Sequence, residues 1–256
     1  MNLRVLITRE PHRSARLVRA LSERGIVGIS IPVTRIEFIE NPAPCPDLRN
    51  FSCIAFTSVN GVEAFAMWLE RNHLSLLNQI RLAAVGPSTA EILRTRLRKP
   101  DIISHNTTAA GLAGEIICSL AGETAQEILW PCAQKRTPEL ENELTRAGMH
   151  VTPWECYRTV PVPASELQPR LENVSPWDAA LFSAPSAVRA FVEAWPLPWS
   201  FAVIAIGPST SAALHEAGVP NPLVSPRATD GQILETILSA IRHPFPSESY
   251  PSQATE

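Results

Sequence analysis

Short apolar runs alternate with stretches of helical periodicity along this chain of 256 residues. Four runs show no alternation of apolar and polar positions, which is typical of strands buried on both faces of a parallel sheet, and they lie at 53–58, 80–86, 178–183 and 201–207. Residues 5–9 and 27–32 predict two more strands. The predicted helices are 13–24, 60–71, 87–98, 108–120, 185–194, 208–217 and 229–242. This order predicts an α/β protein with doubly wound parallel sheets.

The chain contains an internal repeat. AVGPSTAEIL (84–93) is similar to AIGPSTSAAL (205–214), and FTSVNGVEAF (56–65) is similar to FSAPSAVRAF (182–191). Two further pairs follow the same order, 17–25 with 140–148 and 104–117 with 225–238. Four blocks at an offset of about 120 residues indicate two diverged copies of one unit. Taken alone, the repeat favours two consecutive halves.

The GPST segment predicts a small anion-binding corner. Gly86 can be the N-cap of a helix with Pro87 at its first position, where a missing N–H costs nothing. The N–H groups of Ser88 and Thr89 then have no partner within the helix, and a glycine cap has no side chain to accept them. The helix N-terminus adds partial positive charge beside two hydroxyl groups. The second copy repeats this corner at Gly207, Pro208, Ser209 and Thr210.

Hydroxyl residues mark further corners where other strands end. They are Thr57, Ser58, Ser183 and Ser186. One such corner is explained by serine and threonine being good helix N-caps. Several corners in both copies favour a ligand with several acidic groups, because ligands of open parallel sheets lie beyond the carboxyl ends of the strands.

Charge and cysteine content narrow the class of protein. The chain has 22 Lys and Arg residues and 25 Asp and Glu residues. It contains no long basic run of the kind that would indicate nucleic-acid binding. The five cysteines form no C-x-x-C pair, which favours reduced thiols in the cytoplasm and no metal site. The segment MNLRVLITRE carries charge within its apolar run, unlike a signal peptide, and no run is long enough to span a membrane. The Pro- and Ser-rich tail 243–256 is predicted to be disordered.

The ordered set LITRE, FTSVNGVEAF, AVGPSTAEIL, ECYRT, FSAPSAVRAF and AIGPSTSAAL resembles the uroporphyrinogen-III synthase family over about residues 3–240. The resemblance implies two flavodoxin-like lobes joined by a two-stranded linker. It also implies an exchanged arrangement, with residues 1–35 and 162–242 in one lobe and 38–160 in the other. The segments PVTRIE (32–37) and WECYRT (154–159) are then the extended crossings.

The resemblance also implies an activity. The family's substrate is hydroxymethylbilane, a linear tetrapyrrole bearing acetate and propionate groups. Its terminal hydroxyl leaves as water, and the ring closes with ring D inverted. A monomer without a cofactor, acting on this small molecule, is implied, and transient contact with the enzyme that supplies the unstable bilane is a further partner interaction to consider.

The predicted site residues come partly from the corners at the helix starts and partly from the family resemblance. Tyr157 in ECYRT matches the tyrosine usually proposed as the family's proton donor, at the mouth of the cleft. Arg9, Arg35 and Arg158 can bind carboxylates by charge-assisted hydrogen bonds or remain solvated. Lys135 and Arg136 follow a strand end, near Cys132, where the family often has Arg or Gly. The predicted substrate-binding residues are Arg9, Thr57, Ser58, Gly86, Ser88, Thr89, Lys135, Ser183, Ser186, Gly207, Ser209 and Thr210.

The sequence leaves two alternative functions open. A two-lobed protein could bind a small polycarboxylate without chemistry, although the absence of an export signal weighs against it. A nucleotide-dependent transferase is weakened because neither G-x-x-x-x-G-K-[ST] nor G-x-G-x-x-G occurs. Ser58 and Ser183 lack the His and Asp partners of a nucleophile pattern, so acyl transfer has no support.

Overall fold

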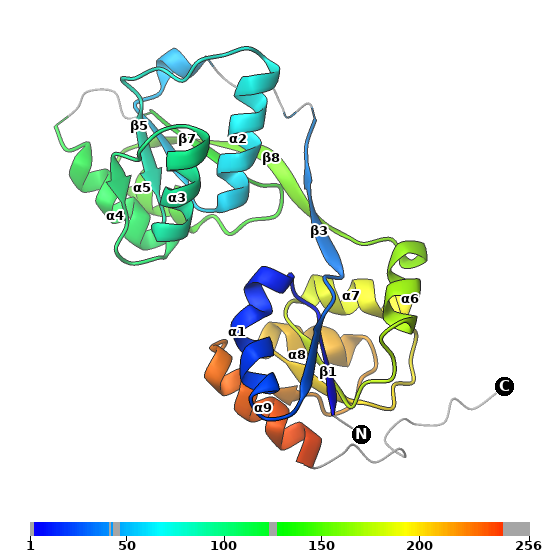
Figure 1. Cartoon of the computed structure of the whole chain (residues 1–256). Coiled ribbons are helices and arrows are strands. Elements are labelled where there is room, and N and C mark those ends of the chain that lie inside the picture. The colour runs from blue at the N-terminus through cyan, green and yellow to red at the C-terminus, as the bar shows by residue number, and fades with distance from the viewer. Residues whose placement is uncertain (1–2, 41, 43–46, 123–126, 243–256) are drawn as a thin grey trace. The chain divides into compact units, whose positions relative to one another are not determined.

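The computed structural model describes residues 3–40, 42, 47–122 and 127–242 (Figure 1). The chain divides into two compact units. Unit 1 consists of Met1–Arg35 and Val160–Glu256, and unit 2 is Ile36–Thr159. The tail predicted to be disordered, residues 243–256, lies outside the described residues.

Unit 1 is built on a five-stranded sheet of order β11-β10-β9-β1-β2, with parallel pairing between neighbours. Its strands are β1 (Arg4–Ile7), β2 (Val27–Ser30), β9 (Ala179–Phe182), β10 (Ala202–Ala205) and β11 (Leu223–Val224). Its helices are α1 (Pro11–Ser22), α6 (Ala164–Glu172), α7 (Pro185–Ala194), α8 (Pro208–Glu216) and α9 (Asp230–Arg242). Two apolar clusters cover the faces of the sheet, one with α1 and α9 and the other with α6, α7 and α8.

Unit 2 contains a six-stranded sheet of order β3-β8-β7-β4-β5-β6. Its strands are β3 (Thr34–Phe38), β4 (Cys53–Phe56), β5 (Arg81–Ala84), β6 (Ile102–Ile103), β7 (Glu127–Ala133) and β8 (His150–Pro161). Its helices are α2 (Val59–Arg71), α3 (Pro87–Arg96), α4 (Ala109–Ser119) and α5 (Glu139–Arg146), with a 3-10 turn η1 at Leu48–Asn50. One cluster packs α2 and α3 on the sheet, and the other packs α4 and α5.

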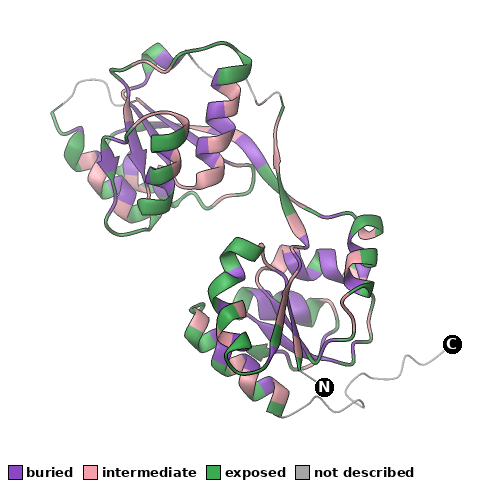
Figure 2. Ribbon diagram, viewed as in Figure 1, coloured by how far each residue is buried: buried purple, intermediate pink, exposed green. Residues whose placement is uncertain are grey.

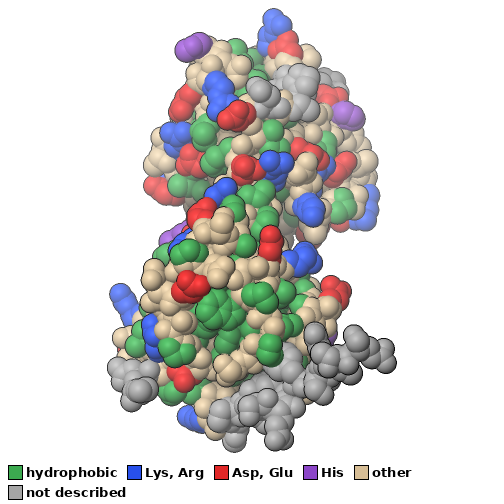
Figure 3. All heavy atoms as spheres, turned by 90° about the vertical axis from the view of Figure 1, so that its right-hand side faces the viewer, with side chains coloured by type: hydrophobic (Ala, Val, Ile, Leu, Met, Phe, Trp, Pro, Cys, Tyr) green, Lys and Arg blue, Asp and Glu red, His purple; other side chains and the backbone are tan. Residues whose placement is uncertain are grey.

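The burial of the strands explains why they could be predicted. Every residue of β4, β9 and β10 is buried, as expected of central strands in a parallel sheet (Figure 2). The parallel α/β architecture is therefore confirmed. Figure 3 shows acidic and basic side chains interspersed over the face it presents.

The observed elements differ from the predicted ones at identifiable points. The strand predicted at 5–9 ends at Ile7, and the one predicted at 53–58 ends at Phe56. The hydroxyl groups of the polar residues that follow make side-chain hydrogen bonds, with Leu181 for Thr8, Trp130 for Thr57 and Gly61 for Ser58. The pattern does not predict α6, which contains Pro169. It also misses β6 and β11, which are two residues long.

Candidate functional site

The two GPST corners adopt the predicted helix starts. Gly86 is the N-cap of α3, Gly207 is the N-cap of α8, and a proline takes the first helical position in both. Neither cap has a side-chain hydrogen bond, so the N–H groups of the first turn receive no partner from the capping residue, and a helix N-terminus of this kind is suited to an anion. The predicted cap geometry is confirmed in each unit.

The side chains at these corners divide into exposed and buried ones. Ser88 and Ser209 are exposed, whereas Thr89 is 4% exposed and Thr210 is 1% exposed. Substrate binding by the corner residues stays a prediction, and the accessible hydroxyl groups are those of Ser88 and Ser209. The threonine side chains pack into their own units, and each corner offers one serine hydroxyl together with backbone N–H groups.

In unit 1, Thr8 and Ser183 join the ends of β1 and β9. The Thr8 hydroxyl donates to the carbonyl of Leu181 at 3.0 Å, and the Ser183 hydroxyl donates to the carbonyl of Thr8 at 2.9 Å. The Ser183 N–H donates to Thr8 Oγ1 at 3.3 Å. Ser183 is thus engaged within the unit, and the N-cap of α7 is Ala184, which leaves Ser186 as the half-buried serine of that helix start.

Arg9 follows β1 at the same edge of the sheet. Burial lowers the pKa of its guanidinium, and the carboxylate of Asp230 acts in the opposite direction. A partly desolvated guanidinium interacts more strongly with an anion than a fully hydrated one does. Arg9, Ser186 and the α8 corner therefore remain candidates for an anionic ligand of unit 1.

In unit 2, the Thr57 and Ser58 hydroxyls already have partners. Thr57 Oγ1 accepts a hydrogen bond from the indole N–H of Trp130 at 3.0 Å. Ser58 is the N-cap of α2, and its Oγ accepts from the N–H of Gly61 at 3.1 Å. Ser58 Oγ also lies 2.8 Å from the Tyr157 hydroxyl. The capping role explains why serine stands at position 58, and the contact with Tyr157 is an additional feature.

Tyr157 is positioned by an irregularity in β8. Along the β7–β8 pair, Cys132 lies opposite Glu155, and Ala133 lies opposite Tyr157. Cys156 is therefore the extra residue of a β-bulge, which turns the next side chain to the other face of the sheet. Tyr157 consequently packs with Trp154 and Cys156 in the cluster beneath α2, where it is 7% exposed.

The basic residues after β7 have different surroundings. Lys135 is exposed. Arg136 lies over the ring of Trp130, with 5.4 Å from its guanidinium carbon to the ring centroid, and its Nη1 lies 2.8 Å from Glu155 Oε1. The sequence predicts Lys135 as a substrate-binding residue, whereas Arg136 is the one of the two that described contacts hold in place. Glu155 is 19 positions from Arg136 and comes from the neighbouring strand β8, so no local pattern predicts this ion pair.

The other arginines near the unit boundaries form ion pairs. Arg35 Nη1 lies 3.1 Å from Glu166 Oε2, and Arg158 Nε lies 2.6 Å from Glu37 Oε2. All four side chains are about half exposed, so these pairs contribute little to stability. Neither arginine is held in the manner of Arg136.

Three further findings concern the cysteines, metal-ligating side chains and helices of the described residues. Burial raises the pKa of the Cys132 thiol to about 12, so it stays protonated at neutral pH. Within the described ranges, no three His, Cys, Asp or Glu side chains gather where they could hold a metal ion. None of the described helices is both long and apolar enough to cross a membrane.

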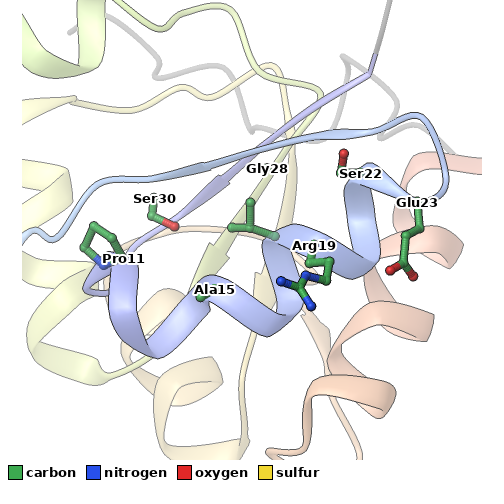
Figure 4. Close-up of a pocket in the computed structure, with 8 residues that line it drawn as sticks. Pro11, Ala15, Arg19, Ser22, Glu23, Gly28 and Ser30 are labelled. Carbon is green, nitrogen blue, oxygen red and sulfur yellow. The ribbon is translucent and has the colours of Figure 1, made fainter.

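A groove of about 730 Å³ lies between α1 and β2 in unit 1 (Figure 4). It is lined by Pro11, Ala15, Val18, Arg19, Ser22, Glu23, Gly28 and Ser30. The described lining includes none of the predicted site residues, so the candidate chemistry lies elsewhere, at the carboxyl ends of the strands.

Gly61 brings the start of α2 close to β7. A Cβ atom at Gly61 would lie 2.7 Å from the carbonyl oxygen of Pro131, which is backbone and cannot turn away. We expect Gly61→Ala to lower the free energy of unfolding by ~1–3 kcal/mol. Gly114→Ala is the matched control in α4, where a Cβ meets nothing within 4 Å, and it should raise that free energy by ~0.5–1 kcal/mol. Denaturant unfolding of both variants measures the difference, and equal stabilities would contradict the close approach.

These features define a class: an α/β protein whose two parallel sheets present helix N-termini, hydroxyl groups and arginines at their carboxyl ends. The family model described as uroporphyrinogen-III synthase HemD matches residues 15–235. The chain therefore belongs to the uroporphyrinogen-III synthase family, which confirms the resemblance inferred from sequence. The family's enzymes are lyases, and a binding protein without catalysis is not favoured.

Curated relatives cover most of the chain. The uroporphyrinogen-III synthase of Chlorobaculum parvum is 29% identical over 225 residues, covering 84% of this chain and 89% of the relative. The chloroplastic uroporphyrinogen-III synthase of Oryza sativa subsp. japonica is 26% identical over 261 residues, covering 93% of this chain and 80% of the relative. Both carry the family name that the motifs suggested.

Solved structures support the same fold. Uroporphyrinogen-III synthetase from Helicobacter pylori has a TM-score of 0.64 at 19% identity, covering 93% of this chain and 99% of that one. A mutant uroporphyrinogen III synthase from Thermus thermophilus has a TM-score of 0.50 at 22% identity, covering 94% of this chain and 99% of that one. At these identities the likeness bears on the α/β fold alone.

Proposed function

We propose that this chain closes hydroxymethylbilane to uroporphyrinogen III, with inversion of ring D and loss of water, in tetrapyrrole and haem biosynthesis. The match of residues 15–235 to the family carries the proposal. The substrate bears acetate and propionate groups, and the backbone N–H groups at the starts of α3 and α8 supply donors suited to carboxylates. In this proposal the enzyme works as a cytoplasmic monomer.

We also infer that the two units are flavodoxin-like lobes that correspond to the two copies of the internal repeat. Each unit carries one GPST corner at the end of a central parallel strand, which supports two diverged copies of one flavodoxin-like unit. The extended segments β3 and β8 would act as the two-stranded linker, since the boundary between the units falls within each of them.

The proposed chemistry begins with the loss of the terminal hydroxyl group. The pyrrole nitrogen drives its departure, and Tyr157 donates a proton so that water leaves. The resulting azafulvene is attacked through the substituted position of ring D, giving a spiro intermediate that fragments and recloses with ring D inverted. Holding both ends of the chain in reach of each other is the main contribution of the protein.

The test of the proposed function is a product analysis. The purified protein is incubated with freshly generated hydroxymethylbilane, and the products are oxidised and resolved as porphyrin isomers. Uncatalysed closure gives the unrearranged isomer, so an excess of the inverted isomer supports the proposal. A protein that leaves the isomer ratio at its uncatalysed value would contradict it.

We expect the reaction to proceed without a metal ion. Exhaustive dialysis against a chelator should leave the rate unchanged, because the proposed steps need only proton transfer and positioning. Addition of zinc or magnesium to the dialysed protein is the control. A rate that falls on dialysis and recovers with either ion would show that the reaction depends on a metal.

A further inference from the structure

The Ser58 and Tyr157 hydroxyls form a hydrogen-bonded pair at the start of α2. The two oxygens are 2.8 Å apart, and Ser58 Oγ also accepts from the N–H of Gly61 at 3.1 Å. A serine hydroxyl has one hydrogen and two acceptor positions. With one acceptor position occupied by Gly61, Ser58 can still donate its hydrogen to the oxygen of Tyr157.

Both partners are held by rigid elements of unit 2. Ser58 caps α2, whose thirteen residues pack against β4 and β7, and a side chain at Gly61 would collide with the backbone of Pro131. Figure 1 shows α2 beside β7 and β8. Tyr157 is aimed at this helix start by the β-bulge at Cys156 and packs against Trp154. The contact therefore depends on the tight packing of α2 against β7 at Gly61.

We propose that Ser58 is a positioning residue that acts through Tyr157, an inference that rests on the proposed function. Tyr157 transfers its phenolic proton to the departing hydroxyl, which leaves as water. Ser58 keeps its own proton and donates a hydrogen bond to the phenolate oxygen that remains. When the last ring bond has formed, ring D loses one proton from the carbon that made the bond, and this proton restores Tyr157.

The Ser58 hydroxyl can have two separate roles. A cap stabilises α2 by accepting from Gly61, whereas a positioning residue must also donate to Tyr157. Hydrogen bonds to charged groups are worth about twice those between neutral groups. Loss of the donor should therefore slow the chemical step more than it weakens the fold.

The experiment compares variants in the full-length protein. Ser58→Gly keeps a residue type that caps helices well but removes the hydroxyl, and Ser58→Thr keeps both. We expect Ser58→Gly to lower kcat by ~10- to 100-fold with KM unchanged, and Ser58→Thr to stay within about threefold of the wild type. Thermal unfolding of each variant reports the capping role separately.

A double-mutant cycle gives the decisive result. If Ser58 acts through the phenol, Ser58→Gly should have no further effect on kcat in a Tyr157→Phe background. An equal loss in both backgrounds, or a Ser58→Gly variant with wild-type kcat, would overturn the inference. A wild-type protein that yields no inverted isomer would instead defeat the proposed function. If Ser58→Gly fails to fold, Ser58→Thr decides, since a loss of kcat despite its hydroxyl would also overturn the inference.

Discussion

Replacing Tyr157 by phenylalanine should slow the enzyme by ~10²-fold, the low end of the range for general acid catalysis. The substitution removes one oxygen and retains the ring that packs with Trp154 beneath α2. A phenol is neutral at pH 7, can donate to a departing hydroxyl and can accept afterwards. The effect stays at the low end because the pyrrole nitrogen itself helps to expel the hydroxyl group.

The assay measures both the rate and the isomer ratio, with Tyr250→Phe as control. Tyr250 is the other tyrosine of the chain and lies outside the described residues. We expect the slow Tyr157→Phe enzyme still to produce the inverted isomer, because positioning of ring D does not depend on the phenol. A wild-type rate would remove the proton-donor role and leave positioning as the whole of catalysis.

Burial would set the conditions for the proposed proton transfer. Tyr157 is 7% exposed and belongs to a buried apolar cluster that includes Phe65 and Trp154. The same packing fixes the ring, so the donor does not have to be ordered when the substrate binds.

The central strands and helix starts could be predicted because they depend on local sequence. Apolar runs such as 53–58 produce buried strands, and Pro87 and Pro208 mark the first positions of their helices. The capping glycines follow from the same local rule. These elements include the backbone donors of the candidate site.

The positions of several side chains could not be predicted because they depend on pairing between strands. The bulge at Cys156 moves Tyr157 to the α2 face, and the local sign of it is two successive apolar residues, Cys156 and Tyr157, after an alternating stretch. The contact of Thr57 with Trp130 joins residues 73 positions apart and leaves no local signal. Register and packing, rather than propensity, determine these contacts.

Introducing a carboxylate at the α8 corner should weaken substrate binding without destabilising the protein. Ser209 is exposed in the first turn of α8, where a negative side chain interacts favourably with the helix N-terminus by ~0.3–1 kcal/mol. The same charge would repel an anionic ligand and compete for the N–H groups. For Ser209→Glu we expect KM to rise by ~10- to 30-fold, which corresponds to ~1.4–2 kcal/mol, with an unchanged or higher melting temperature.

Two matched variants identify the cause of this effect. Ser209→Ala removes the hydroxyl and leaves the backbone donors, so its loss should stay within ~1.5 kcal/mol, the value of one neutral hydrogen bond. Ser239→Glu places the same charge at an exposed position in the last turn of α9 and should leave KM unchanged. The three variants are compared by steady-state kinetics and thermal unfolding. If Ser209→Ala alone abolished turnover, the hydroxyl would take part in the chemistry; if Ser209→Glu left KM unchanged, the α8 corner would not bind a carboxylate. The opposite signs expected for stability and for binding at one position distinguish an anion site from a helix start alone, because a charge that only stabilises the helix raises the melting temperature and leaves KM unchanged.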